Sequence, residues 1–93
     1  MSRTICRHLS IRGLVQGVSY RWAMVREARQ LGVNGWVRNR RDGSVEAMIS
    51  GSPGQIEAML EWSNVGPGGA VVENVMCETA TGEFTDFELR PTA

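Results

Sequence analysis

The sequence lacks several features that would point to particular classes of protein. None of its apolar runs approaches the length of about eighteen residues that a membrane-spanning helix needs, and its first residues lack the apolar centre of a secretory signal. We therefore expect a cytoplasmic protein. Its two cysteines, Cys6 and Cys77, are too few for a disulfide framework, and neither has a second cysteine or a histidine nearby to complete a zinc site. We expect two free thiols on opposite faces of a sheet, no bound metal and no cofactor.

The chain also lacks an excess of charge of either sign. Ten Lys plus Arg residues balance ten Asp plus Glu residues, so the formal net charge is +0. Because binding to DNA, RNA or an anionic membrane depends on positive charge, this balance argues against all three and favours a small-molecule partner. The 93 residues are enough for one domain, residues 1–93, whose folding would bury roughly two-thirds of the chain's surface. No exposed apolar stripe demands a partner, so we expect a monomer.

Periodicity and turn signals predict the order of the secondary structure elements. A capping serine and a proline, Ser52 and Pro53, begin the second helix, and Asp42-Gly43 marks a hairpin turn. The expected strands cover residues 5–13, 33–39, 44–51, 71–79 and 84–90, and the expected helices cover residues 20–31 and the segment from Ser52 to Gly66. This order predicts a ferredoxin-like βαββαβ sandwich of the α+β class, an antiparallel sheet with two helices on one face and a short C-terminal edge strand.

The segment from Val15 to Arg21 is suited to binding an anion. It leads from an apolar strand through Gly17 to the expected start of a helix. Backbone N–H groups can converge around a glycine, a helix N-terminus adds unsatisfied donors, and Arg21 offers a bidentate guanidinium. These features predict a phosphate-like ligand. The alternative is that Arg21 is a solvated arginine in the first turn of a helix.

Asn39 ends an expected strand just before the sequence Arg40-Arg41-Asp42-Gly43. In that place an asparagine is ordinarily a turn former, whose side chain bonds to nearby backbone. An amide can also accept one hydrogen bond and donate another without changing its protonation state, which suits it to hold a water molecule. The residue alone leaves both interpretations open.

Four further segments follow the anion-binding segment at characteristic spacing. They are Gly35-Trp36-Val37-Arg38-Asn39, Asp42-Gly43-Ser44-Val45-Glu46, Gly66-Pro67 and the terminal Phe87 to Arg90. Together these segments resemble the acylphosphatase family over nearly the whole chain, from about Cys6 to Arg90. The resemblance implies a hydrolase that cleaves the carboxyl–phosphate bond of acyl phosphates, and it implies that Asn39 positions the attacking water. The residues that it assigns to substrate phosphate binding are Gln16, Gly17, Val18, Ser19, Tyr20 and Arg21.

The scarcity of acid–base groups agrees with this chemistry. The one histidine, His8, lies in the first expected strand away from both motifs, where we expect a surface residue, and Ser19 has no histidine or lysine base beside it. An acyl phosphate releases a carboxylate, a weak base that needs no protonation. Hydrolysis then requires only that the phosphoryl oxygens be neutralised and that a water be held in line, so we expect a metal-independent reaction with phosphate or sulfate as competing anions.

Two alternative functions stay open, and two positions depart from the family pattern. The chain could bind an anion without turnover, or it could bind nucleic acid through Trp22, Trp36 and Trp62, although we expect these tryptophans to pack against the protein. Tyr20 stands where phenylalanine is usual, so its hydroxyl needs a partner. Asn64 and Val65 stand where basic residues are frequent, which lowers the positive potential there without touching either proposed catalytic residue.

Overall fold

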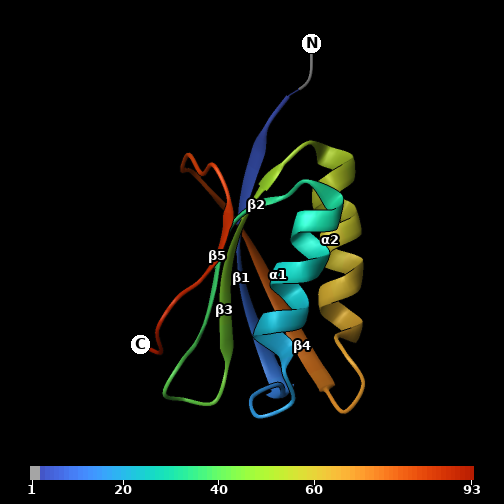
Figure 1. Cartoon of the computed structure of the whole chain (residues 1–93), viewed down its shortest axis with the longest axis vertical. Helices are drawn as coiled ribbons and strands as arrows, with labels where there is room; N and C mark the ends of the chain where they lie inside the picture. The colour runs from blue at the N-terminus through green and yellow to red at the C-terminus, as the bar shows by residue number, and fades with distance from the viewer. Residues whose placement is uncertain (1–2) are drawn as a thin grey trace.

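The computed structural model describes residues 3–93 of the chain. Five strands and two helices follow one another in the predicted order (Figure 1). Their bounds are β1 Ile5–Leu14, α1 Tyr20–Leu31, β2 Asn34–Asn39, β3 Val45–Gly51, α2 Pro53–Val65, β4 Val71–Ala80 and β5 Phe87–Leu89. The last strand is shorter than the predicted 84–90, because only residues 87–89 pair with β2.

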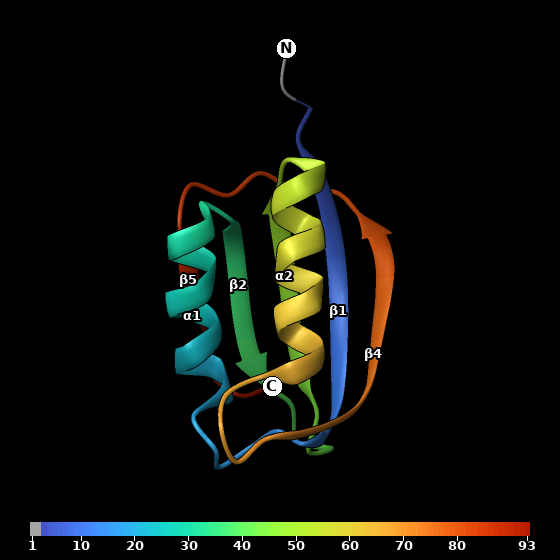
Figure 2. The ribbon, with the colours of Figure 1, turned by 90° about the vertical axis from the view of Figure 1, so that its right-hand side faces the viewer.

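The strands form one sheet in the order β4-β1-β3-β2-β5, and both helices cover the same face of it (Figures 1 and 2). The β4–β1, β1–β3 and β3–β2 pairs are antiparallel, which confirms the ferredoxin-like sandwich. The edge strand β5 instead lies parallel to β2, so the sheet is mixed. The reason is the connection after β4, which crosses the end of the sheet where β2 begins, so that β5 then runs beside β2 in the same direction (Figure 2).

The core lies between the helices and the sheet. Alternate residues of each inner strand point toward the helices, and the helices meet them with residues spaced three and four apart, as the sequence predicted for Met24 and Ala28. The side chains with 0% exposure in this core are Leu9, Ile11, Met24, Ala28, Val37, Val45, Ala47, Ile49, Met59 and Phe87. Their packing fixes both helices on the sheet and so fixes the loops that emerge from it.

The two cysteines lie on opposite faces of the sheet, as predicted. Cys77 pairs with Leu9 across the β1–β4 ladder and therefore shares the parity of the helix-covered face, whereas Cys6 has the opposite parity. Both are free thiols, Cys6 buried and Cys77 exposed, and burial raises the pKa of the Cys6 thiol. Within residues 3–93, neither helix is long and apolar enough to cross a bilayer.

Candidate active site

The loop between β1 and α1 is shaped by two residues in the left-handed backbone conformation. Gly17 has φ 76° and Ser19 has φ 61°, and Ser19 is the only residue other than glycine with positive φ in the described chain. This conformation is unfavourable for a residue other than glycine, and residues that adopt it cluster at functional sites. A Cβ atom added at Gly17 would meet no atom within 4 Å, so the space beside the loop is open to a ligand.

The N-terminus of α1 is left without a side-chain cap. Ser19 is its N-cap residue, but among the described residues no side chain accepts a hydrogen bond there. The second helix differs: Ser52 accepts from the Gln55 backbone N–H, and the Gln55 side chain accepts from the Ser52 N–H in return. A helix start without such a cap keeps its donors and its partial positive charge available to an anion.

Arg21 and Asn39 line one cavity, although they belong to different elements. Arg21 lies in the first turn of α1 and Asn39 is the last residue of β2. The cavity has a volume of about 280 Å³ and is lined by Val15, Gln16, Gly17, Ser19, Tyr20, Arg21, Trp22 and Asn39. The structure thus brings together all of the predicted site residues except Val18, whose side chain instead packs against the hydrophobic core.

The side chain of Asn39 is not a turn former. Its Oδ1 atom is buried and has no hydrogen-bond partner among the described residues. Asp42 stabilises the turn instead, because its Oδ1 accepts from the Ser44 backbone N–H at 2.9 Å and from the Ser44 hydroxyl at 2.6 Å. These two hydrogen bonds, with the nearby arginines, hold the pKa of Asp42 below its usual value. Asn39 is therefore not committed to the turn, and it lines the cavity beside Arg21.

The side chain of Gln16 connects the loop to the strand end that carries Asn39. Its Nε2 atom donates to the carbonyl oxygens of Arg40 at 2.7 Å and Ser44 at 2.8 Å, both in the β2–β3 turn. These contacts hold the loop before α1 against the hairpin, which sets the position of Arg21 relative to Asn39. No local pattern indicates this role, because the turn carbonyls come from a segment distant in the chain.

Tyr20 anchors the start of α1 to the end of α2. Its ring is 1% exposed, and its hydroxyl donates to the carbonyl oxygen of Ser63 at 2.7 Å. If the helix continued beyond its end at Val65, the Ser63 carbonyl would accept from the N–H of residue 67. Residue 67 is Pro67, which has no N–H. A Cβ at Gly66 would lie 2.8 Å from the Tyr20 ring, so only glycine allows this close packing. Burial raises the pKa of Tyr20, which stays protonated.

Replacing Tyr20 with phenylalanine should therefore lower the free energy of unfolding by about 1–3 kcal/mol, the usual cost of leaving a buried carbonyl without its donor. Urea denaturation followed by circular dichroism measures this loss. Ser63→Ala is the matched control, since it removes the hydroxyl that donates to the Met59 carbonyl but keeps the carbonyl that Tyr20 binds. A midpoint for Tyr20→Phe equal to that of the wild type would contradict this account of the hydroxyl.

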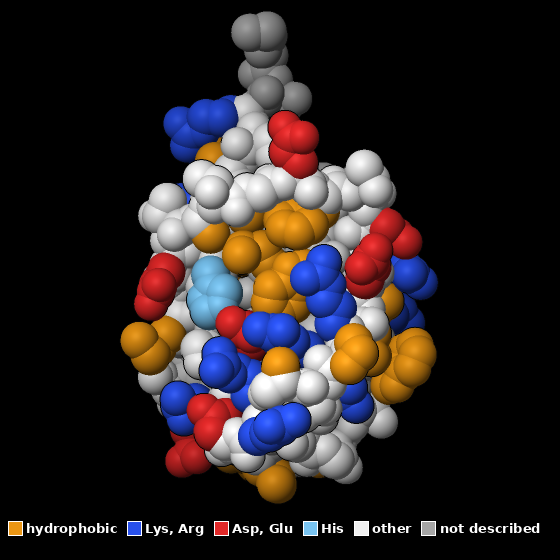
Figure 3. All heavy atoms as spheres, turned by 90° about the vertical axis from the view of Figure 1, so that its left-hand side faces the viewer, with side chains coloured by type: hydrophobic (Ala, Val, Ile, Leu, Met, Phe, Trp, Pro, Cys, Tyr) orange, Lys and Arg blue, Asp and Glu red, His pale blue; other side chains and the backbone are white. Residues whose placement is uncertain are grey.

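The sheet face away from the helices carries a cluster of charges next to the site (Figure 3). Glu46, whose side chain is 9% exposed, accepts from His8 and from Arg38 at 2.7 Å each, and Arg40 lies 3.4 Å away. Burial alone would raise the pKa of Glu46, but these hydrogen bonds and positive charges outweigh it and hold the pKa low. The ionised carboxylate partly neutralises arginines near Asn39, and it holds His8 in the surface position that the sequence predicted.

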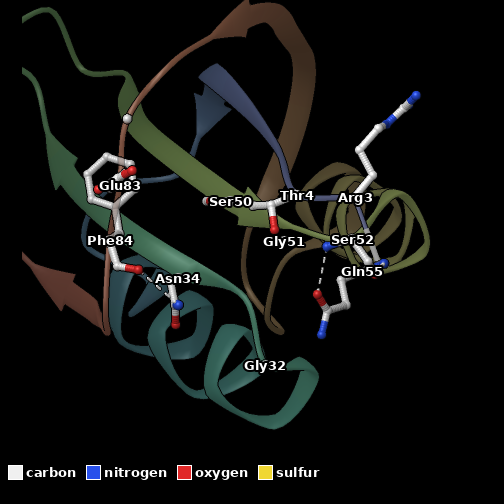
Figure 4. Close-up of a pocket in the computed structure, with 11 residues that line it drawn as sticks. Arg3, Thr4, Gly32, Asn34, Ser50, Gly51, Ser52, Gln55, Glu83 and Phe84 are labelled. Atoms are coloured by element: carbon white, nitrogen blue, oxygen red, sulfur yellow. Dashed lines mark hydrogen bonds between the residues drawn. The ribbon is translucent and has the colours of Figure 1, made fainter. Parts of the chain in front are cut away.

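A larger cavity, of about 540 Å³, lies at the other end of the sheet, beside the start of α2 (Figure 4). Its main polar side chains already have partners. Asn34 donates to the Phe84 carbonyl at 3.1 Å, and Gln55 donates to the Leu31 carbonyl at 2.9 Å while accepting from the Ser52 N–H. These contacts join the crossing segment and the helices to the sheet, so the cavity is a junction between elements. It contains neither Arg21 nor Asn39.

The fold and this site define a small α+β protein with a cavity at one end of its sheet, beside the uncapped start of α1. Comparison with known proteins shows which family it belongs to. The acylphosphatase family model matches residues 7–89. An acylphosphatase from Acidovorax sp. is 50% identical over 90 residues, which cover 96% of this chain and 93% of that protein. The chain belongs to the acylphosphatase family, as its motifs indicated.

Solved structures agree with this assignment. An acylphosphatase from Coxiella burnetii superimposes with a TM-score of 0.90 at 35% identity, covering 94% of this chain and 93% of that one. One from Bacillus subtilis gives a TM-score of 0.89 at 25% identity, covering 92% of this chain and 98% of that one. The ferredoxin-like arrangement predicted from the sequence is therefore that of solved acylphosphatases.

Proposed function

We propose that this protein hydrolyses the carboxyl–phosphate bond of acyl phosphates, giving a carboxylate and inorganic phosphate. The observation that carries the proposal is the placement of an uncapped helix N-terminus, Arg21 and the unpaired Asn39 amide around one cavity. Membership of the acylphosphatase family supports it. The whole chain, residues 1–93, would act as one domain.

In this proposal the loop and Arg21 hold the phosphoryl group. Backbone N–H groups from Gln16 to Tyr20 and the start of α1 surround its oxygens, while the Arg21 guanidinium donates two parallel hydrogen bonds. Within residues 3–93 no carboxylate forms an ion pair with Arg21; the ion pairs there involve His8 and five other arginines. The positive charge of Arg21 is thus available to stabilise the negative charge of the transition state.

Asn39 would hold the water that attacks the phosphorus. The Asn39 side chain lines the cavity, and an amide can accept a proton of the water or donate to its oxygen without changing its own protonation state. The water oxygen forms a bond to phosphorus as the bond from phosphorus to the carboxylate oxygen breaks, and the electron pair of that bond leaves with the carboxylate. The proton lost by the water is taken up by the phosphate product or by solvent. No general acid is needed, because a carboxylate leaves without protonation.

Benzoyl phosphate should be hydrolysed much faster than p-nitrophenyl phosphate, and EDTA should leave the rate unchanged. The reason is the leaving group. Benzoate is a far weaker base than p-nitrophenolate, and the residues that line the cavity include no general acid to protonate p-nitrophenolate as it leaves. Ultraviolet absorbance follows the hydrolysis of benzoyl phosphate, and visible absorbance follows the release of p-nitrophenolate from p-nitrophenyl phosphate. Each rate is measured with and without EDTA. Equal rates on the two substrates, or loss of activity on chelation, would refute the proposed chemistry.

The same assay separates the hydrolase from its alternatives. A protein that only binds an anion would be protected by phosphate against unfolding but would not turn over benzoyl phosphate.

We also propose that phosphate and sulfate compete with substrate, because the loop and Arg21 recognise the tetrahedral anion. We further propose that the protein acts as a monomer in the cytoplasm. The tryptophans form no aromatic row of the kind that binds nucleic-acid bases. Trp36 is buried beneath the guanidiniums of Arg38 and Arg90, each with its Cζ 4.9 Å from the ring centroid, and Trp22 and Trp62 lie on helices.

A further inference from the structure

Trp22 does not pack against the core, in contrast to the other two tryptophans. It is 66% exposed, whereas Trp36 is 8% exposed and Trp62 packs against Tyr20 with ring centroids 5.3 Å apart. Trp22 nevertheless lines the cavity that contains Arg21 and Asn39. A large aromatic side chain at the mouth of a substrate cavity offers apolar surface that nothing in the described chain covers.

The position of Trp22 follows from the way α1 is anchored. Tyr20 points into the core, and residues two apart on a helix are turned by about 200° from one another. Trp22 must therefore face outward while staying in the first turn, next to Arg21. Its surface continues along α1 past Val25 and Arg26, which line a shallow apolar depression together with it. A group larger than acetyl would find surface to lie on there.

The direction of attack bears on where the acyl group would lie. In-line attack puts the water and the leaving carboxylate on opposite sides of the phosphorus. Asn39 belongs to the sheet and Trp22 to the helix layer, and both line the cavity that holds the phosphoryl group. A water held by Asn39 would direct the leaving carboxylate away from Asn39, and Trp22 is the exposed aromatic side chain among the residues that line the cavity.

We propose that Trp22 contacts the acyl group of the substrate and strengthens binding of planar aromatic acyl groups relative to small aliphatic ones. The proposal rests on the hydrolase function proposed above. The indole ring stacks on the aromatic acyl group, while the phosphoryl group is held independently by the loop and Arg21. Trp22 thus determines specificity without taking part in the bond-making step.

The test compares benzoyl phosphate with acetyl phosphate. In Trp22→Ala, the ratio of kcat/KM for benzoyl phosphate to kcat/KM for acetyl phosphate should fall roughly tenfold, equivalent to about 1.4 kcal/mol. Trp22→Phe, which keeps an aromatic ring, should retain most of the preference. Val65→Ala is the matched control, since Val65 is a 70% exposed apolar residue of α2 that does not line the cavity. It should leave the ratio unchanged.

Inhibition by phosphonates gives a readout that does not depend on turnover of the aromatic substrate. With acetyl phosphate as substrate, benzylphosphonate should inhibit the wild type more strongly than methylphosphonate, and Trp22→Ala should abolish most of that difference. A specificity ratio and a phosphonate preference that both survive in Trp22→Ala would overturn the role of Trp22. If the wild type hydrolysed neither acyl phosphate, the proposed function itself would fail instead, so the two failures are distinguishable.

Discussion

Asn39→Ala should lower kcat for benzoyl phosphate by about 10²-fold or more, while inhibition by inorganic phosphate stays near that of the wild type. The amide acts on the attacking water, whose position matters only when the bond to phosphorus forms. The phosphoryl oxygens keep the loop and Arg21 as their partners in this variant. Steady-state kinetics with phosphate as competitor separates the two effects, because loss of transition-state stabilisation alone lowers kcat without weakening anion binding.

The matched control is Asn34→Ala, at the other end of the same strand. Asn34 donates to the Phe84 carbonyl beside the larger cavity, so its loss changes the fold locally but not the site. We expect it to lower stability and to leave kcat unchanged. Should Asn39→Ala keep full turnover while remaining folded by circular dichroism, the water-positioning role would be wrong.

Arg21→Ala should raise KM, weaken phosphate inhibition and lower kcat/KM by roughly 10³-fold or more, since a guanidinium on the phosphoryl group stabilises charge in the ground state and still more in the transition state. Arg21→Lys should rescue little. Lysine keeps the charge but loses the planar fork that binds two oxygens and fixes the orientation of the group. Initial rates over a range of substrate and phosphate concentrations measure all three quantities.

Arg12→Ala serves as the control for Arg21. Arg12 lies on β1, where it contacts the exposed carboxylate of Asp42 at 3.5 Å, and it does not line the cavity. Removing it lowers the positive charge of the molecule by the same amount, so it tests whether charge alone attracts the substrate. Equal loss of phosphate inhibition in the two variants would show that Arg21 acts through the general field of the protein and not by direct contact.

Much of the fold follows from features that the chain carries locally. The spacing of Met24 and Ala28 determines which face of α1 is buried, and Ser52 with Gln55 determines where α2 begins. Asp42-Gly43 determines the hairpin turn. These features could be read directly because they depend on hydrogen bonds and side-chain periodicity within a few residues. The resemblance to acylphosphatases rests on the same local motifs.

The candidate site needed more than local pattern. Arg21 and Asn39 were each ambiguous in the sequence, because a first-turn arginine and a strand-end asparagine both have ordinary structural uses. Their placement around one cavity depends on the β2–β3 pairing, the packing of α1 and the contacts of Gln16 with the turn. The burial of the Asn39 oxygen without a partner depends on the same packing.

The sequence by itself therefore determined the order of the elements and the faces that they bury, and it predicted the residues that would bind a phosphate. Only the tertiary structure decided that β5 runs parallel to β2, that the Tyr20 hydroxyl binds the carbonyl that Pro67 leaves without a donor, and that Trp22 lies open beside the site. The physical reason is that each of these depends on which distant segment a group meets. The packing of whole helices and strands sets these long-range contacts, so local periodicity cannot predict them.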